Sequence, residues 1–248
     1  MVEWLSTRQA AELLGVSEAS VRRWSDQGIL PVQRVGNRRE RKFQTDHLDH
    51  FRAPARTASP GPNGRQSDVV AVTVGTVLIQ TYTHLAVFYD TDERRLRLAS
   101  PFLREGLLAG QPCLLAAFGP EAEIHLESLR GLGLDVDAAQ QAGQLRVWSE
   151  PVATIAEGLR WWEDALWSAL NTGTKVIRVV GETVSQRRRF GSEPDLLAYE
   201  AALNLVTSRF PCVVLCQYDV REFSGPALLT ALRAHPDMLA LPMRTLIS

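Results

Sequence analysis

Continuous apolar segments alternate with amphipathic ones through the last two thirds of the chain. Segments that are apolar at nearly every position predict strands that are buried on both faces. Segments with apolar residues three and four apart predict the helices that cover those faces. The alternation therefore predicts a mainly parallel α/β sheet with helices on both sides.

The strands are expected at 84–90, 112–118, 145–149, 175–182 and 211–219. The helices are expected at 92–109, 121–131, 152–171, 194–208 and 224–234. Residues 69–82 are rich in β-branched side chains and are expected to be extended, with uncertain pairing.

The first 56 residues have a different pattern, with short helical segments followed by a basic turn. Ser6 and Gln9 fit a capping box, and the apolar residues after them form one face of a first helix. A second helix is expected after Ser17, with Val21 and Trp24 on its buried side. Two short strands are expected on either side of the turn at 36–37, and a third helix at 46–51. Trp24 and Phe43 are expected to be core residues, because so small a domain needs every large apolar side chain it has.

A segment rich in Pro, Gly, Ser and Asn separates the two patterns at residues 57–68. Such a composition predicts a flexible linker with a root-mean-square span of roughly 20 Å. The expected division is a small domain at 1–56, a linker at 57–68 and an α/β domain at 69–248. The length of 248 residues fits two unequal domains.

Positive charge is concentrated at the start of the chain. Residues 1–56 contain ten Lys and Arg against seven Asp and Glu, a net charge of +3, and the remainder has a net charge of −4. This distribution favours a nucleic-acid-binding head joined to an acidic partner domain. We expect a cytoplasmic protein without membrane contact, because no segment is apolar for long enough to span a bilayer and the first residues lack a secretory pattern. Three cysteines do not suggest a disulfide framework.

The head resembles the MerR-like winged helix-turn-helix family along residues 5–51. The resemblance is carried by Ala10-Ala11, by the segments at 14–17 and 21–24, by Gly28 to Pro31, and by the basic turn that Phe43 closes. A short second helix fits the major groove of double-stranded DNA, and a basic hairpin beside it can follow the phosphates. The resemblance implies DNA contacts from the second helix, and a wing beyond it. The residues so implied are Ser17, Ser20, Arg22 and Arg23 on the helix, and Arg34, Arg38, Arg39, Arg41 and Lys42 on the wing.

Residues scattered in order through the alternating part form a recognisable set: His84, Phe88-Tyr89, Pro101 to Leu103, Gly106-Leu107, Gly181-Glu182, Tyr199-Glu200, Asn204, Cys216 to Asp219 and His235-Pro236. With these residues the second part resembles the MEDS domain, the sensory region of DcmR-like repressors, over roughly residues 83–236. The resemblance implies a RecA/KaiC-like sheet used as a sensor, with hydrocarbon derivatives proposed as ligands. No general ligand is implied.

A ligand site is expected at the carboxyl ends of the strands, where parallel sheets bind their ligands. Aromatic and acidic residues gather there, which suits a small organic molecule with a polar or cationic group. The candidate ligand-binding residues are His84, Tyr89, Asp90, Trp148, Glu182, Glu200, Tyr218 and Asp219. An equally weighted interpretation is that Asp90 and Asp219 cap the following helices, and that Glu182 and Glu200 pair with arginines such as Arg187 to Arg189.

The sequence predicts no catalytic residues, no metal site and no cofactor. The loop after the first long strand, YDTDERRLRL, lacks the glycines and lysine of a phosphate-binding loop, which argues against nucleotide hydrolysis. Cys212 and Cys216 are expected roughly 13 Å apart on one strand face, too far for a shared zinc. His47 and His50 lack further ligands, and His235 is expected to end the last helix.

We expect a ligand-responsive transcriptional regulator rather than an enzyme. Two alternatives stay open: an enzyme of RecA-like fold that processes a small molecule, and a module that binds a partner protein. MerR-type heads act in pairs, yet no heptad pattern follows residue 51. A homodimer is therefore expected to form through the second domain, with segment 69–82 as the suggested contact.

Overall fold

The computed structural model describes residues 4–14, 18–26, 30–36, 39–45, 48, 70–148 and 154–235. The segment predicted as a linker, 57–68, and the predicted third helix of the head, except for Leu48, lie outside these residues. Within the described ranges, every helix is too short or too polar to cross a membrane.

The N-terminal part combines two helices with a small antiparallel sheet. Strand β1 (Trp4–Ser6) leads into α1 (Thr7–Leu14) and α2 (Glu18–Asp26), and β2 (Gln33–Val35) pairs with β3 (Glu40–Gln44). The predicted capping box is confirmed, because the Ser6 and Gln9 side chains each accept the other's backbone N–H. Phe43 is fully buried, as predicted for a core residue. Strand β1 was not predicted; it pairs with β3 and places β3 in the middle of the sheet.

The second part is built on five parallel strands, as the sequence predicts. The strands are β6 (Thr83–Tyr89), β7 (Cys113–Ala116), β8 (Leu145–Val147), β9 (Ile177–Glu182) and β10 (Cys212–Asp219), in the spatial order β6-β10-β9-β7-β8. Every residue of the strands β9 and β10 is buried, which explains why most of their positions are apolar.

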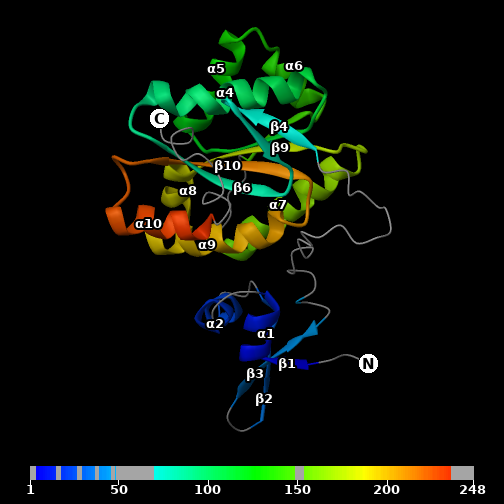
Figure 1. Ribbon diagram of the computed structural model, residues 1–248, viewed down its shortest axis with the longest axis vertical. Helices are drawn as coiled ribbons and strands as arrows, with labels where there is room; N and C mark the ends of the chain where they lie inside the picture. Colours follow the sequence, from blue (N-terminus) through cyan, green and yellow to red (C-terminus); the bar gives the residue numbers. More distant parts are fainter. Residues whose placement is uncertain are drawn as a thin grey trace.

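Helices cover both faces of the sheet (Figure 1), as predicted. One layer holds α4 (Asp92–Leu108), α5 (Pro120–Gly131) and α6 (Val136–Gln141), and the other holds α7 (Ile155–Leu170), α8 (Thr183–Phe190), α9 (Glu193–Thr207) and α10 (Gly225–Ala234). The strand order explains this division. The chain moves outward across the sheet from β6 to β8 and returns from β8 to β10, so right-handed crossovers place the two sets of helices on opposite faces.

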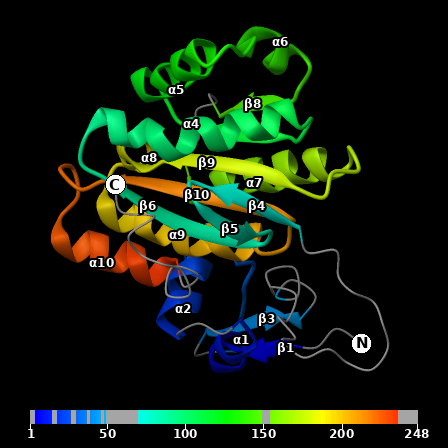
Figure 2. The same cartoon turned by 45° about the horizontal axis from the view of Figure 1, so that its top comes forward.

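Segment 69–82 is extended as predicted, and its strands β4 (Ala71–Val74) and β5 (Val77–Gln80) pair with each other as an antiparallel hairpin, visible beside the main sheet in Figure 2. Two helices were not predicted. Helix α6 is only six residues long and depends on the Asp135 side chain as its N-cap. Helix α8, with the sequence TVSQRRRF, lacks an apolar period, so no pattern predicted it. It begins at a Glu182 cap and ends at Gly191, whose φ of 85° suits glycine.

Candidate functional site

The eight predicted ligand-binding residues lie on both faces of the sheet. Neighbouring strands in register put Tyr89 beside Asp219, and Gln217 beside Glu182, so these side chains face the layer of α4 and α5. His84, Cys216 and Tyr218 alternate with them and face α9 and α10. The structure therefore divides the predicted site into two separate groups of polar residues.

Four buried residues from four elements meet where β6 and β9 end; we name Tyr89, Arg95, His125 and Glu182 the carboxyl-edge cluster. The Tyr89 hydroxyl donates to Glu182 Oε1 at 3.0 Å. Arg95 Nε and His125 Nε2 lie 3.8 and 3.7 Å from Glu182 Oε2. The Arg95 guanidinium also lies over the Tyr89 ring, 5.2 Å from its centroid. A cation, a carboxylate, a phenol and an imidazole thus share one buried position.

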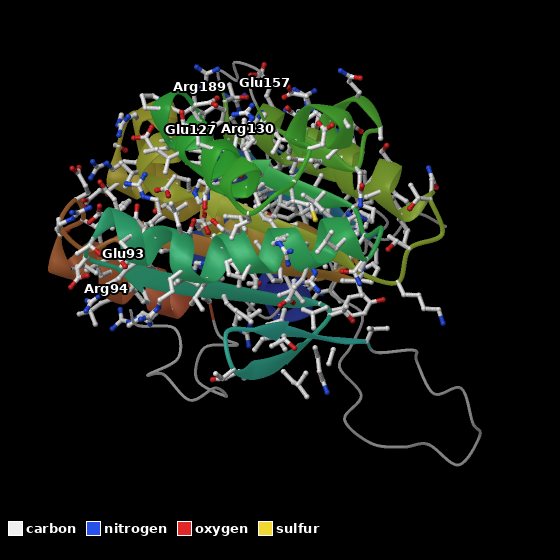
Figure 3. The ribbon with its side chains drawn as sticks, turned by 90° about the horizontal axis from the view of Figure 1, so that it is seen from above. Glu93, Arg94, Glu127, Arg130, Glu157 and Arg189 are labelled. Atoms are coloured by element: carbon white, nitrogen blue, oxygen red, sulfur yellow. The ribbon has the colours of Figure 1, made fainter. Side chains whose placement is uncertain are left out.

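Figure 3 shows α4 and α5 from above, with Glu93 and Arg94 marking the first turn of α4, and Glu127 and Arg130 marking α5. These two helices contribute Arg95 and His125 to the carboxyl-edge cluster. Several of its polar atoms make no hydrogen bond of acceptable geometry to the described residues: Glu182 Oε2, Arg95 Nε and Nη1, and both His125 ring nitrogens. Buried polar atoms almost always have a partner, either protein or bound water. The cluster therefore has donors and acceptors to offer a polar molecule.

Burial and neighbouring charges shift the pKa values of two members of this cluster, Tyr89 and Arg95. Burial, together with the Glu182 charge, raises the pKa of Tyr89, so the phenol stays a neutral donor. Burial opposes the Arg95 charge, but Glu182, Tyr89 and Asp92 together raise the pKa of Arg95 above its ordinary value. A ligand in contact with the cluster would meet one fixed cation beside one neutral hydroxyl.

The interpretation of Asp90 and Asp219 as helix caps is wrong. Thr91 caps α4 and Ser224 caps α10 through their own side chains. Asp90 instead pairs with Arg94 at 2.8 Å, and Asp219 accepts from Arg221 at 2.6 Å. Burial alone would raise the pKa of Asp219, but the hydrogen bonds from Arg221 outweigh it and lower that pKa.

The expected pairing of Glu182 and Glu200 with Arg187 to Arg189 is also wrong. Arg187 pairs with Glu222 at 2.8 Å, Arg188 pairs with Glu121 at 2.5 Å, and Arg189 lies over the Phe118 ring. The buried arginine beside Glu182 is Arg95, and Glu200 has histidines as neighbours. Arg187 and Arg188 therefore bind other glutamates and Arg189 packs on an aromatic ring, while Glu182 and Glu200 have other partners.

A second cluster lies on the opposite face of the sheet; we name His84, Glu200, Cys216 and His235 the His–Glu–Cys cluster. One ligand-type atom from each residue lies within 4.8 Å of the other three, and all four residues are buried. Burial would raise the pKa of Glu200, but the neighbouring His235 and His84 imidazoles lower it to about 2. Burial lowers the pKa of His84. His235 also ends α10, as predicted.

Two of the three predicted aromatic ligand residues, Trp148 and Tyr218, are packed against other rings inside the protein. Tyr218 stacks on Phe88 and packs edge-on against His235, with ring centroids 5.6 and 5.9 Å apart. Trp148 is fully buried and stacks on Trp161 at 5.0 Å. A surface cavity of about 300 Å³ lies at the α4–α5 layer, but its lining residues Pro101, Arg104, Glu105 and Leu132 include none of the predicted ligand residues.

The predicted DNA-contacting residues that the structure describes lie on α2 and on the β2–β3 hairpin. Arg22 is exposed and pairs with Glu18 one turn away at 2.6 Å. Arg34 and Arg41 both reach Asp26, at 2.8 and 2.7 Å, and thereby hold the hairpin beside the end of α2. Arg39 is exposed and Lys42 is half-buried. Ser17 and Arg38 lie outside the described residues, and the side chains of Ser20 and Arg23 are not described.

Sequence reasoning missed Arg95 and His125, and treated His235 only as a helix end. A single Arg on α4 and a single His on α5 carry no local signal, because only the packing of these helices on the sheet brings them to Glu182. His84 and His235 are 151 positions apart, so no spacing rule links them.

The fold and its head define a class: a helix-turn-helix module joined to a KaiC-like α/β domain. A KaiC-like protein from Pyrococcus horikoshii has a similar fold, with a TM-score of 0.50 and 15% identity over 65% of this chain and 77% of that one. The chain belongs to the MEDS family, described as the methanogen/methylotroph, DcmR sensory domain, whose model matches residues 83–236. A helix-turn-helix domain model matches residues 4–55. A relative in Methylorubrum extorquens named transcriptional repressor DcmR is 38% identical over 98% of this chain and 93% of its own length.

Proposed function

We propose that this chain is a ligand-responsive, DNA-binding transcriptional regulator and not an enzyme. The observation that carries the proposal is the match to the repressor, which extends through the head and the MEDS domain alike. In this proposal residues 1–56 form a MerR-like winged helix-turn-helix that binds double-stranded DNA. Residues 57–68 link it to a sensory domain at 69–248. Binding of a small organic molecule to the sensory domain changes the affinity of the head for DNA.

The carboxyl-edge cluster is the proposed ligand position. It lies at the carboxyl ends of β6 and β9, which flank β10 in the sheet. The connections after β6 and β9 cover opposite faces, and ligands of open parallel sheets bind where the connections diverge in this way. The open donors and acceptors of Glu182, Arg95 and His125 suit a polar group on the ligand.

The same strand ends argue against nucleotide hydrolysis. A phosphate-binding loop needs glycines and a lysine between strand and helix. Here Asp90 and Thr91 connect β6 to α4, and Asp92 and Glu93 occupy the first turn of the helix. Their negative charge would repel a phosphate where a P-loop attracts one.

Native mass spectrometry of the full-length chain tests the sensory part of the proposal. We expect a mass excess larger than any metal ion, which is lost on denaturation. Adding the released compound should then change DNA affinity by a factor of about 5–150, the usual range of allosteric coupling. A compound that binds without changing DNA affinity would contradict the proposed coupling.

Removing a wing cation should weaken DNA binding without changing its sequence preference. Arg39 is exposed at the β2–β3 turn and has no ion pair within the described part of the head. We expect Arg39→Gln to lower affinity for every duplex by a similar factor, and to reduce the salt slope by about one for each lost phosphate contact. Fluorescence anisotropy on duplexes selected from a random pool measures both quantities at several salt concentrations.

Arg130→Gln is the matched control for this experiment, because Arg130 is an exposed arginine on α5 in the sensory domain. It should leave the salt slope unchanged. Arg38→Gln removes the neighbouring charge of the proposed wing. Unchanged affinity in both Arg38→Gln and Arg39→Gln would exclude the wing from the interface.

We propose a homodimer that forms through the β4–β5 hairpin. Leu78 on β5 is 70% exposed, the largest exposed fraction among the large apolar side chains of the described residues. Leu78→Lys should shift the chain toward monomer in sedimentation velocity, because a charge placed in an apolar contact must be desolvated. Leu229→Lys on α10, at 59% exposed, is the control. A dimer that survives Leu78→Lys at the same dissociation constant excludes the hairpin.

A further inference from the structure

The proposed function does not use the His–Glu–Cys cluster on the other face of the sheet. Four side chains, from β6, α9, β10 and the end of α10, each bring one ligand-type atom within 4.8 Å of the other three. His84 Nε2 lies 3.0 Å from Cys216 Sγ, 3.1 Å from His235 Nε2 and 3.5 Å from Glu200 Oε2. His235 Nε2 lies 3.3 Å from the same carboxylate oxygen.

These separations are close to those within a tetrahedral metal site. With metal–ligand bonds of about 2.0–2.3 Å, neighbouring ligand atoms lie about 3.3–3.7 Å apart. The contacts around His84 and His235 therefore need only small adjustments to surround an ion. Imidazole, thiolate and carboxylate groups are all ligands that zinc takes in proteins.

A hydrogen bond outside the cluster orients the His235 imidazole. His235 Nδ1 lies 2.7 Å from the Ala231 carbonyl oxygen, and a carbonyl can only accept, so Nδ1 carries the proton. In the neutral ring Nε2 then has a free lone pair, and it lies 3.1 Å from His84 Nε2 and 3.3 Å from Glu200 Oε2. Metal-binding histidines are typically held by a partner on their other ring nitrogen in this way.

Hydrogen bonds among the four side chains leave some polar atoms of this cluster without a good partner. A proton on His84 Nε2 can point to only one of its three neighbours. Within the described residues, neither Glu200 oxygen makes a hydrogen bond of acceptable geometry, although the side chain is fully buried. A divalent cation would bind all four atoms at once, and with a thiolate and a carboxylate as ligands it would leave no net charge in the interior.

We propose that His84, Glu200, Cys216 and His235 bind one divalent transition-metal ion, and that Zn²⁺ fits the site best. The ligands come from two strands and two helices, so the ion would fasten α9 and the end of α10 to the sheet. The inference does not depend on the proposed ligand or on DNA binding. The sequence predicted no metal site, because the cysteines and the histidines were each examined as pairs close in sequence. The proposed site instead combines residues that are far apart in sequence.

Metal analysis of the untagged full-length chain tests the proposal. After expression in zinc-containing medium and extensive dialysis, we expect about one zinc per chain by plasma mass spectrometry. Chain grown with Co²⁺ instead should show the visible absorption of tetrahedral cobalt and a thiolate-to-cobalt charge-transfer band in the near ultraviolet. A folded chain that holds no metal under both conditions would overturn the proposal.

Variants of the two cysteines outside the cluster test which thiolate binds the metal, and they leave the four proposed ligands in place. The chain has three cysteines, and Cys113 and Cys212 lie outside the cluster. In the variant Cys113→Ser/Cys212→Ser, Cys216 is the single thiol, so the charge-transfer band should remain. Cys216→Ser should lose the band, and His235→Ala should lower the metal content. Loss of the band in the double variant while it stays folded, or its persistence in Cys216→Ser, would contradict the assignment.

Discussion

Replacing Trp162 by alanine is expected to lower the free energy of unfolding by about 3–5 kcal/mol. Trp162 on α7 is fully buried and lies edge-on to Trp148 and Trp161, with ring centroids 6.1 and 5.1 Å apart. Its indole N–H donates to the Tyr199 hydroxyl on α9. The substitution creates a large cavity between α7, α9 and the sheet, and leaves a buried hydroxyl without its donor.

Urea unfolding followed by circular dichroism measures this loss. Trp162→Phe should cost less than the alanine variant, because the ring packing is partly kept while the hydrogen bond is lost. Trp167→Ala on the same helix is the matched control, since Trp167 is 46% exposed and should cost no more than about 1 kcal/mol. Equal losses at Trp162 and Trp167 would contradict the described packing of α7.

Most strands were predictable because their burial is nearly uniform. Segments such as 177–182 and 212–219 are buried at every position, and most of their residues are apolar. Polar exceptions have buried partners: Glu182 accepts from Tyr89, and Arg178 donates to the Phe102 carbonyl. The same principle failed for α8, whose buried residues include Thr183, Ser185 and Gln186. Their polar atoms bond to nearby strands, for instance Gln186 to the Ala116 carbonyl, and a hydropathy pattern does not register such contacts.

The two clusters were only partly predictable, for a topological reason. The rule that ligands bind at the carboxyl ends of strands led to Tyr89, Glu182 and Asp219, which lie together in the structure. The resemblance to the MEDS domain contributed His84 and Glu200, but not the side of the sheet they occupy. Strand alternation puts His84 and Tyr89 on opposite faces, since they are five positions apart on β6. The predicted strand at 84–90 already contains both residues, so applying this alternation to it would have separated the two groups.

Glu182→Leu is expected to cost about 3–5 kcal/mol, because it leaves the buried Arg95 without its buried counter-charge. Glu182 is fully buried and Arg95 is 7% exposed, so water cannot replace the carboxylate. The variant also removes the N-cap of α8, since the Glu182 side chain accepts the Val184 N–H. Glu123→Leu is the control: Glu123 pairs with Arg130 at the surface, where an ion pair contributes at most about 1 kcal/mol.

A double-mutant cycle separates the charge pair from the helix cap. Replacing both charged residues in Glu182→Leu/Arg95→Met should restore part of the stability, because a buried pair replaced by apolar side chains no longer leaves an unpaired charge. The cap is lost in both variants and does not contribute to that recovery. Additive losses would show that Arg95 and Glu182 do not interact.

Glu182→Gln keeps the side-chain shape while removing its charge, so it tests whether Glu182 also belongs to the ligand site. A lower melting temperature with an unaltered ligand response would limit Glu182 to a structural role and exclude it from the ligand site.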